Sequence, residues 1–416
     1  MRHLSMVLVL IVLLVPLRSH GAGDAAVAAQ FINALGLDLL STASAPGADA
    51  LLSPYSIQSA LAMTYAGADG DTKREMAAVL HYEGAGGDPH EALNELQAAL
   101  DRIAADSAKA AATEGASDPF TYVFANRLFG QDGYDFRESF TGFIEQRYRA
   151  PMQLMNFQNK PDRARVEINA WVDSQTKHRI RDLIPPGALN SETRLVLVNA
   201  LYLKAPWSSA FAASATLPRP FHIGGRPPFD VPTMRGEIRV GYEKRDDYTV
   251  VTVPYLRGRE LQLLILIPDA LDGLAALEKS VTPELLSSSG RVPQRDALLC
   301  LPKLKLEPPV MKLNDALMSL GMKTAFDKPQ GSANFDLIAP RQPDDYLRIS
   351  AVFHKAFMDV DEKGTEAAAA TAVGMAKVTS EMPGPIEVKI DRPFLFAIQH
   401  RASGACLFLG RVVDPR

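Results

Sequence analysis

Few residues in the 416-residue sequence have the types and spacing that catalysis would require. His90-Glu91 begins the zinc-binding pattern His-Glu-x-x-His, but Asn94 stands where the second histidine should be. Residues 174–177 match the Ser-x-x-Lys pattern of β-lactamase-like enzymes, yet the companion patterns Lys-Thr-Gly and Ser-Asp-Asn are absent. The sequence has no nucleophile elbow, phosphate-binding loop or dinucleotide-binding glycine pattern. It therefore predicts no enzyme, no metal site and no cofactor.

Charge and cysteine content restrict the partners further. The net charge is -4, so we expect no electrostatic attraction to nucleic acid or to an anionic membrane surface.

The only two cysteines, Cys300 and Cys406, lie inside apolar runs. Two interpretations stay open: buried free thiols, which the apolar neighbours favour, and a single disulfide, which export from the cell would permit.

The first residues predict a secretory signal peptide covering 1–22. Arg2 precedes an apolar run from Val7 to Leu17, and the small residues Gly21 and Ala22 follow. A basic start, an apolar segment of about 7–15 residues and a small-residue exit are typical of such a peptide. A membrane-spanning helix would need about 20 apolar residues. We expect cleavage near Gly21 or Ala22 and a secreted protein, either extracellular or, in a bacterium, periplasmic.

The segment 362–382 is the hardest part of the chain to explain in an ordinary globular protein. On propensity alone, Ala367–Ala370 favours a helix, so an exposed helix or an alanine-rich link is one interpretation. However, about twenty mostly small and uncharged residues separate the strand-like stretches 347–360 and 386–390. Loops of this length in a compact domain are usually functional.

The same segment also has the pattern of a strand that could enter a sheet. In a strand, alternate side chains point to opposite faces. One face would carry Thr365, Ala367, Ala369, Thr371 and Val373, and the other Glu366, Ala368, Ala370 and Ala372. The first face is small or β-branched throughout, while Glu366 is the only charged residue of the nine and would face solvent. The segment therefore suits two structures, a loop and a central strand.

The remaining elements predict an α+β fold. Helical periodicity dominates the first half and strand patterns follow it. We expect helices at 25–40, 55–65, 71–80, 89–112, 137–148 and 162–178, and strands at 195–203, 248–255, 261–267, 393–398 and 406–413. Because no linker rich in Pro, Gly and Ser divides the chain, we predict a single domain over residues 23–416.

Several motifs occur in one order along residues 25–416. They are Leu52-Ser53-Pro54-Tyr55-Ser56-Ile57, Ile168-Asn169-x-Trp171-Val172, Thr193–Tyr202, Trp207, Leu301-Pro302-Lys303, His354-Lys355-Ala356-Phe357 and Phe408–Pro415. Together with the segment above, they resemble the serpin family. The resemblance implies three β-sheets, about nine helices and an exposed reactive-centre loop at about 362–385. It also implies a suicide mechanism, in which a serine protease cuts the loop and the cut loop inserts into the central sheet before the acyl-enzyme is hydrolysed.

The resemblance also implies roles for individual residues in three groups. The hinge, where insertion begins, comprises Glu362, Gly364, Thr365, Glu366, Ala367, Ala368, Ala369, Ala370 and Thr371. The breach, at the opening end of the sheet, comprises Lys303, Trp207 and Glu362, and the shutter, beneath its centre, comprises Ser53, Ser56, Asn199 and His354. Ordinary structural roles remain open for the shutter: a helix cap for Ser53, a strand-end residue for Asn199 and a satisfied core histidine for His354.

The resemblance places the reactive bond sixteen positions after Glu362, at Val378-Thr379. A small aliphatic residue there suits an elastase-like protease with a shallow pocket. The alternative, Lys377, would suit a trypsin-like protease. The predicted function is thus a secreted, monomeric serine protease inhibitor. A non-inhibitory serpin acting as a carrier or chaperone, and an inhibitor of cysteine proteases, are the alternatives.

Overall fold

The six predicted helices form near their expected positions, and three short helices between residues 274 and 320 were not predicted. The computed structural model describes residues 20–114, 119–343, 345–366 and 384–416, and this part contains nine α-helices. They are α1 (His20–Thr42), α2 (Pro54–Tyr65), α3 (Gly70–Val79), α4 (Pro89–Glu114), α5 (Glu138–Tyr148), α6 (Pro161–Gln175), α7 (Leu274–Ser280), α8 (Pro283–Ser288) and α9 (Asn314–Leu320). α2 shows the local cause: the Ser53 hydroxyl accepts a hydrogen bond from the Ser56 amide, and Pro54 occupies the first turn.

The strands pair into two mixed sheets of nine strands each within the described residues. They are β1 (Ala50–Leu52), β2 (Thr121–Phe124), β3 (Arg127–Gln131), β4 (Gln153–Met155), β5 (Leu195–Pro206), β6 (Leu217–Phe221), β7 (Phe229–Lys244), β8 (Tyr248–Tyr255), β9 (Leu261–Pro268), β10 (Gln294–Pro302), β11 (Leu304–Leu306), β12 (Met311–Lys312), β13 (Ala351–Ala356), β14 (Met358–Asp361), β15 (Gly364–Thr365), β16 (Ile386–Lys389), β17 (Phe394–His400) and β18 (Ala405–Val412). The α+β class is confirmed.

The first sheet has the order β1-β18-β17-β9-β8-β7-β10-β16, with β6 beside β7. The 16-residue strand β7 pairs in turn with β6, β10 and β8 along its length. This one strand holds β6, β8 and β10 in a single hydrogen-bonded sheet. Hydrogen bonding therefore gives two continuous sheets in the described part of the chain.

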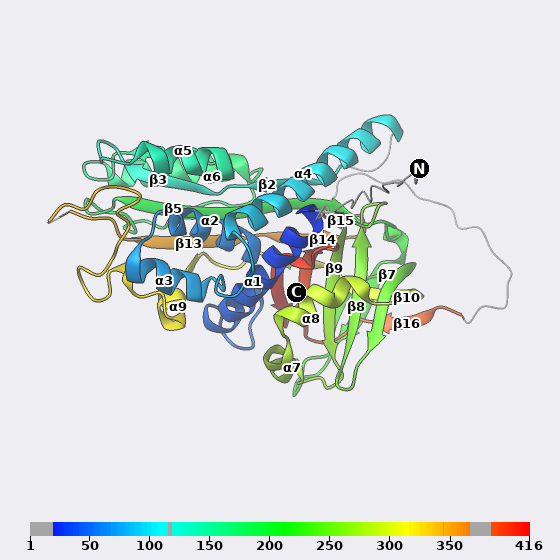
Figure 1. Cartoon of the computed structure of the whole chain (residues 1–416). Coiled ribbons are helices and arrows are strands. Elements are labelled where there is room, and N and C mark those ends of the chain that lie inside the picture. Colours follow the sequence, from blue (N-terminus) through cyan, green and yellow to red (C-terminus); the bar gives the residue numbers. More distant parts are fainter. Residues whose placement is uncertain (1–19, 115–118, 344, 367–383) are drawn as a thin grey trace, which may run out of the picture.

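The second sheet carries the candidate site. Its order is β11-β14-β15-β5-β13-β12, while β2 and β3 pair with the other edge of β5 and β4 pairs with β3. Figure 1 shows α5 and α6 on one side of β5 and α2 and α3 on the other. Val196 and Val198 pack with α6, and Leu195 and Leu197 pack with α2. Both faces of β5 are thus covered, as its nearly continuous apolar run predicts.

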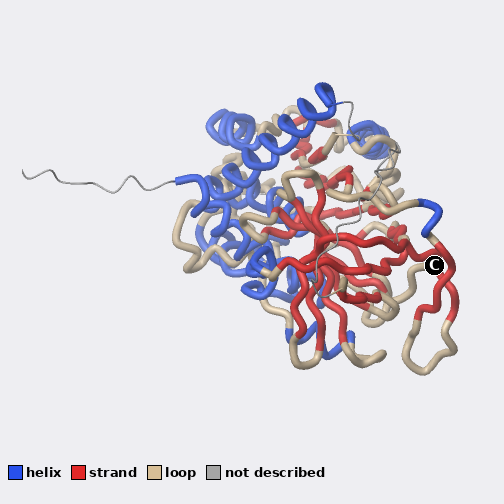
Figure 2. Tube along the Cα trace, turned by 90° about the vertical axis from the view of Figure 1, so that its right-hand side faces the viewer, coloured by secondary structure: helices blue, strands red, loops and turns tan. Residues whose placement is uncertain are grey.

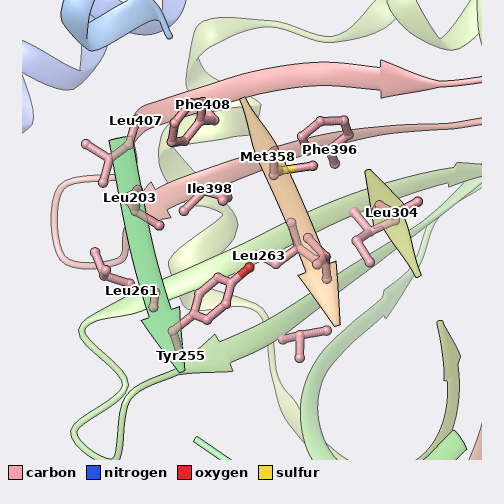
Figure 3. Close-up of a cluster of buried hydrophobic side chains, with 14 of the residues drawn as sticks. Leu203, Tyr255, Leu261, Leu263, Leu304, Met358, Phe396, Ile398, Leu407 and Phe408 are labelled. Carbon is pink, nitrogen blue, oxygen red and sulfur yellow. The ribbon is translucent and has the colours of Figure 1, made fainter. Parts of the chain in front are cut away.

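One of the three buried apolar clusters lies between the two sheets. Figure 2 shows most of the helices gathered on one side of the molecule and most of the strands on the other. In Figure 3, Leu203 of β5 and Met358 of β14 face Ile398 of β17 and Phe408 of β18. Tyr255 at the end of β8 completes this layer below β5. The C-terminal part of β5 and the strand β14 therefore pack against a buried apolar layer of the first sheet.

One helix of the described residues could cross a membrane by length and composition alone. It is the part of α1 from Ala25 to Thr42, of which 56% is buried inside the structure. Phe31, Ile32 and Leu35 are almost completely buried there, so the apolar character of this helix serves the core. Residues 1–19, which include most of the predicted signal peptide, lie outside the described residues.

Candidate functional site

The second sheet forks at Phe357, and the short strand β15 fills the open end of the fork. On one side of the fork β13 pairs directly with β5 in parallel, up to the pair Ala356 and Leu201. Beyond Phe357, β14 leaves β5 and β15 lies between them, antiparallel to both. Thr365 is opposite Ala205 of β5 on one side and Val360 of β14 on the other. The predicted strand 347–360 is therefore broken at Phe357, because β14 pairs with the returning chain instead of β5.

Gly364 allows the close approach of β15 to β5. Its φ is +150°, and a Cβ atom there would lie 2.2 Å from the carbonyl oxygen of Ala205. No other residue type fits without moving the backbone. The Asp361 carboxylate accepts hydrogen bonds from the amides of Lys363 and Gly364, at 2.8 and 3.3 Å, and so shapes the turn that brings the chain back into the fork.

Thr365 points into the core, on the face that the strand pattern predicts. It is 1% exposed, and its hydroxyl lies 2.7 Å from that of Tyr255. Tyr255 stacks on Trp207 with 4.3 Å between ring centroids and 6° between planes. Burial raises the pKa of Tyr255 well above its ordinary value. A small hydroxyl side chain at position 365 therefore fits this neutral, closely packed site, and a long charged one does not.

The three breach residues lie together at the same end of the sheet. The Glu362 carboxylate lies 3.0 Å from Lys303 Nζ and accepts a 2.7 Å hydrogen bond from the Thr216 hydroxyl. The Trp207 indole donates to the carbonyl of Asp361 at 2.8 Å. Burial acts to raise the pKa of Glu362, but the hydrogen bonds from Thr216, from the backbone and from Lys303 outweigh burial and lower the pKa. Glu362 is thus held as a carboxylate.

The four shutter residues form a buried network below the closed part of the fork. His354 Nε2 accepts a hydrogen bond from the Ser53 amide at 3.0 Å, so the proton is on Nδ1, which lies 2.6 Å from Asn199 Oδ1. Burial lowers the pKa of His354 to about 3, so the ring is neutral at ordinary pH. The Ser56 hydroxyl donates to Asn126 at 2.8 Å. Ser53 also caps α2, so its ordinary role and its place in the network coexist.

Other predicted residues lie apart from this site or outside the described residues. Ala367–Thr371 of the hinge, the reactive bond Val378-Thr379 and the alternative Lys377 fall within 367–383, which the structure does not describe. Cys300 and Cys406 are buried free thiols, and burial raises the pKa of Cys406 to about 12. Within the described residues, no group of acidic, histidine or cysteine side chains could hold a metal ion.

Sequence reasoning missed three residues of the site. Thr216 and Tyr255 complete the surroundings of Glu362 and Thr365. Arg179, in the loop after α6, lies 3.0 Å from the carboxylate of Glu366. Each reaches the site from a distant part of the chain, so no local pattern marks it. Glu366 itself was expected to face solvent, but its side chain is only 4% exposed and lies beside Arg179.

Comparisons with known proteins agree on one family. The family model described as "Serpin (serine protease inhibitor)" matches residues 30–415. A curated relative, the leukocyte elastase inhibitor of Bos taurus, is 37% identical over 92% of this chain and 97% of its own length. Among solved structures, uncleaved ovalbumin has a TM-score of 0.77 at 27% identity, covering 94% of this chain and all of its own. Serpin48 of the insect Tenebrio molitor has a TM-score of 0.75 at 29% identity, over 96% of this chain and all of its own.

Proposed function

The chain belongs to the serpin family, and from this premise we propose that it inhibits serine proteases by a suicide mechanism. The observation that carries the proposal is the half-filled fork, in which β15 already pairs on both sides while β13 and β5 close the rest of the sheet. After a protease cuts the chain beyond β15, the residues that follow Thr365 can continue this strand. Strand addition to a sheet is a common mode of recognition, here within one molecule.

Insertion would displace an attached protease over a long distance. Each residue added to β15 advances the strand by about 3.3 Å, so a dozen residues move the acyl bond by tens of Å. Hydrolysis of an acyl-enzyme depends on accurately placed groups, and small displacements slow it strongly. The protein itself contributes no catalytic group in this mechanism, and we infer that it is not an enzyme.

The site residues take the following proposed roles. The hinge comprises Glu362, Gly364, Thr365, Glu366 and Ala367–Thr371, and it starts the new strand. The shutter residues hold β5 and β13 together until insertion separates them, because His354 on β13 joins Asn199 on β5 to the start of α2. The breach pair Lys303–Glu362 fixes the turn that leads into β15. We assign these roles to a single domain spanning 23–416.

We propose an elastase-like protease as the partner and Val378-Thr379 as the bond that it cuts. The small side chain of Val378 suits a shallow pocket, and the name of the bovine relative points to an elastase. Cleavage after Lys377 by a trypsin-like protease is the alternative. The inhibitor would act as a monomer, without a cofactor, and the residues from Arg2 to Leu17 support export with removal of 1–22. N-terminal sequencing of protein collected from the medium would test export.

The decisive test is the formation of an SDS-resistant complex. The purified chain should form one with an elastase-like protease, and mass spectrometry of the released fragment should begin at Thr379. A fragment beginning at Val378 would instead assign the bond to Lys377. Clean cleavage without any stable complex would favour a non-inhibitory carrier or chaperone. A complex with a cysteine protease alone would favour the cross-class alternative.

A further inference from the structure

Glu366, the first residue after β15, occupies an unfavourable position. Its φ is +51°, a left-handed conformation that turns the chain out of the sheet, although its amide still donates to the Asp359 carbonyl at 2.8 Å. Its side chain is 4% exposed, and Oε1 lies 3.0 Å from Arg179 Nε without a well-aligned hydrogen bond. Burial raises the pKa of Glu366, against the opposing effects of Tyr202 and Arg179. The ion pair with Arg179 thus stabilises a carboxylate whose charged form burial disfavours.

Arg179 connects this carboxylate with the fork. Its guanidinium also lies over the ring of Phe357, 5.3 Å from the centroid, where β14 departs from β5. The loop that carries Arg179 is itself fixed, since His178 has a left-handed φ of +63° and its ring lies 2.7 Å from the Asp173 carboxylate. Arg179 therefore contacts both the residue with which a longer strand would continue and the residue at which the fork opens.

The register of the fork identifies a second partner for Glu366. Thr365 is opposite Ala205, and both side chains are buried on the core face. Continuing the antiparallel strand by one residue places Glu366 opposite Lys204. Alternation then puts both side chains on the other face of the sheet. Opposite charges directly across a strand pair stabilise it.

We propose that Glu366 exchanges ion-pair partners during loop insertion, from Arg179 in the uncut protein to Lys204 in the inserted strand. Arg179 is then a positioning residue that delays insertion, and Lys204 is one that favours it. This inference rests on the proposed function, because it concerns the insertion step of that mechanism. Single exposed or cross-strand ion pairs change equilibria by factors of about two to five, which sets the size of the expected effects.

Trp207 can report the insertion directly. The chain has two tryptophans, and Trp207 stacks on Tyr255, which in turn contacts Thr365. In a Trp171→Phe background, stopped-flow fluorescence after mixing with saturating elastase-like protease, corrected for the signal of the protease alone, should follow the surroundings of Trp207 as the strand forms. Arg179→Gln should raise the limiting insertion rate about two- to five-fold, and Lys204→Gln should lower it by a similar factor. Arg181→Gln, in the same loop and paired with Asp173, is the matched control and should change nothing.

The role of Glu366 itself is tested in double variants. In a Glu366→Gln background, Arg179→Gln and Lys204→Gln should lose their effects on the rate, because the shared carboxylate is gone. Equal rates for Arg179→Gln and Arg181→Gln would overturn the exchange while leaving insertion itself intact. Effects that persist without Glu366 would overturn it as well. If the parent is cleaved completely with neither a fluorescence change nor an SDS-resistant complex, both the exchange and the proposed function are wrong.

Discussion

Acidification should destabilise the protein through His354. Burial lowers its pKa from the ordinary 6.5 to about 3, so the unfolded chain binds a proton that the folded chain excludes. The free energy of unfolding therefore falls as the pH drops below 6.5, and the loss stops growing below about pH 3. With these two values, the loss from pH 7 to pH 5 is about 2 kcal/mol, and its limit near pH 3 is about 5 kcal/mol.

The structural cause is specific to the shutter. Protonation at Nε2 would turn an acceptor into a donor that faces the donating amide of Ser53 at 3.0 Å. The contact between α2 and β13 would then become repulsive, while the bond to Asn199 could remain. Because β13 and β5 meet here, acid should also speed the spontaneous loss of inhibitory activity.

Urea denaturation at pH 5, 6 and 7 measures the effect, with His354→Gln as the reference. The variant will be less stable at neutral pH, so the comparison is between slopes against pH. His90 and His400 also have lowered pKa values, chiefly from burial, but they are present in both proteins and cancel in the difference. The variant should lose about 2 kcal/mol less than the parent between pH 7 and pH 5. Parallel profiles would refute a buried neutral His354.

Three further results are expected. Thr365→Arg should convert the inhibitor into a substrate, because burial beside Tyr255 disfavours a charged side chain. Gels should then show cleavage without a stable complex. The control variant Thr365→Ser should still trap the protease. Cleavage near Val378-Thr379 should raise the melting temperature in calorimetry, since insertion adds a paired central strand, and an unchanged value would argue against insertion. Lys303→Gln should lower the free energy of unfolding by less than about 1 kcal/mol, because Lys303 is 39% exposed. It should also speed polymerisation on mild heating, which native gels would show. A polymerisation rate equal to that of the parent would contradict a role for the breach pair.

Local patterns predicted about half of the described helices and strands, and they missed the longest strand, β7. α2 begins where Ser53 and Pro54 indicate, and β8 covers the predicted stretch 248–255 in full. The run at 195–203 predicts a strand buried on both faces, and β5 is such a strand. The fork at Phe357 could not be predicted in this way. Its neighbours continue a strand pattern without interruption, and only pairing with β15 makes β14 diverge from β5.

The family resemblance predicted some residues of the candidate site. Others could be identified only from contacts in the folded chain. Lys303 and Glu362 were expected to meet because motifs around both resemble one family, and they lie 3.0 Å apart. Thr216 and Arg179 could not be found, since each is a common residue type in an unremarkable stretch. Their contribution comes from positions more than 140 residues away from the hinge, which only the folded chain brings together.

The fork would allow a stable sheet to accept the strand that the proposed mechanism requires. In the uncut chain the parallel pairs between β13 and β5 satisfy the backbone groups of both, so the sheet presents no unpaired edge there. Insertion would break this one ladder and form two, one on each side of the new strand. The gain is thus a single additional ladder, and it comes only after β13 and β5 separate at His354 and Asn199. Because the first two pairs, at Gly364 and Thr365, already exist, the barrier lies in that separation and in the release of Glu366.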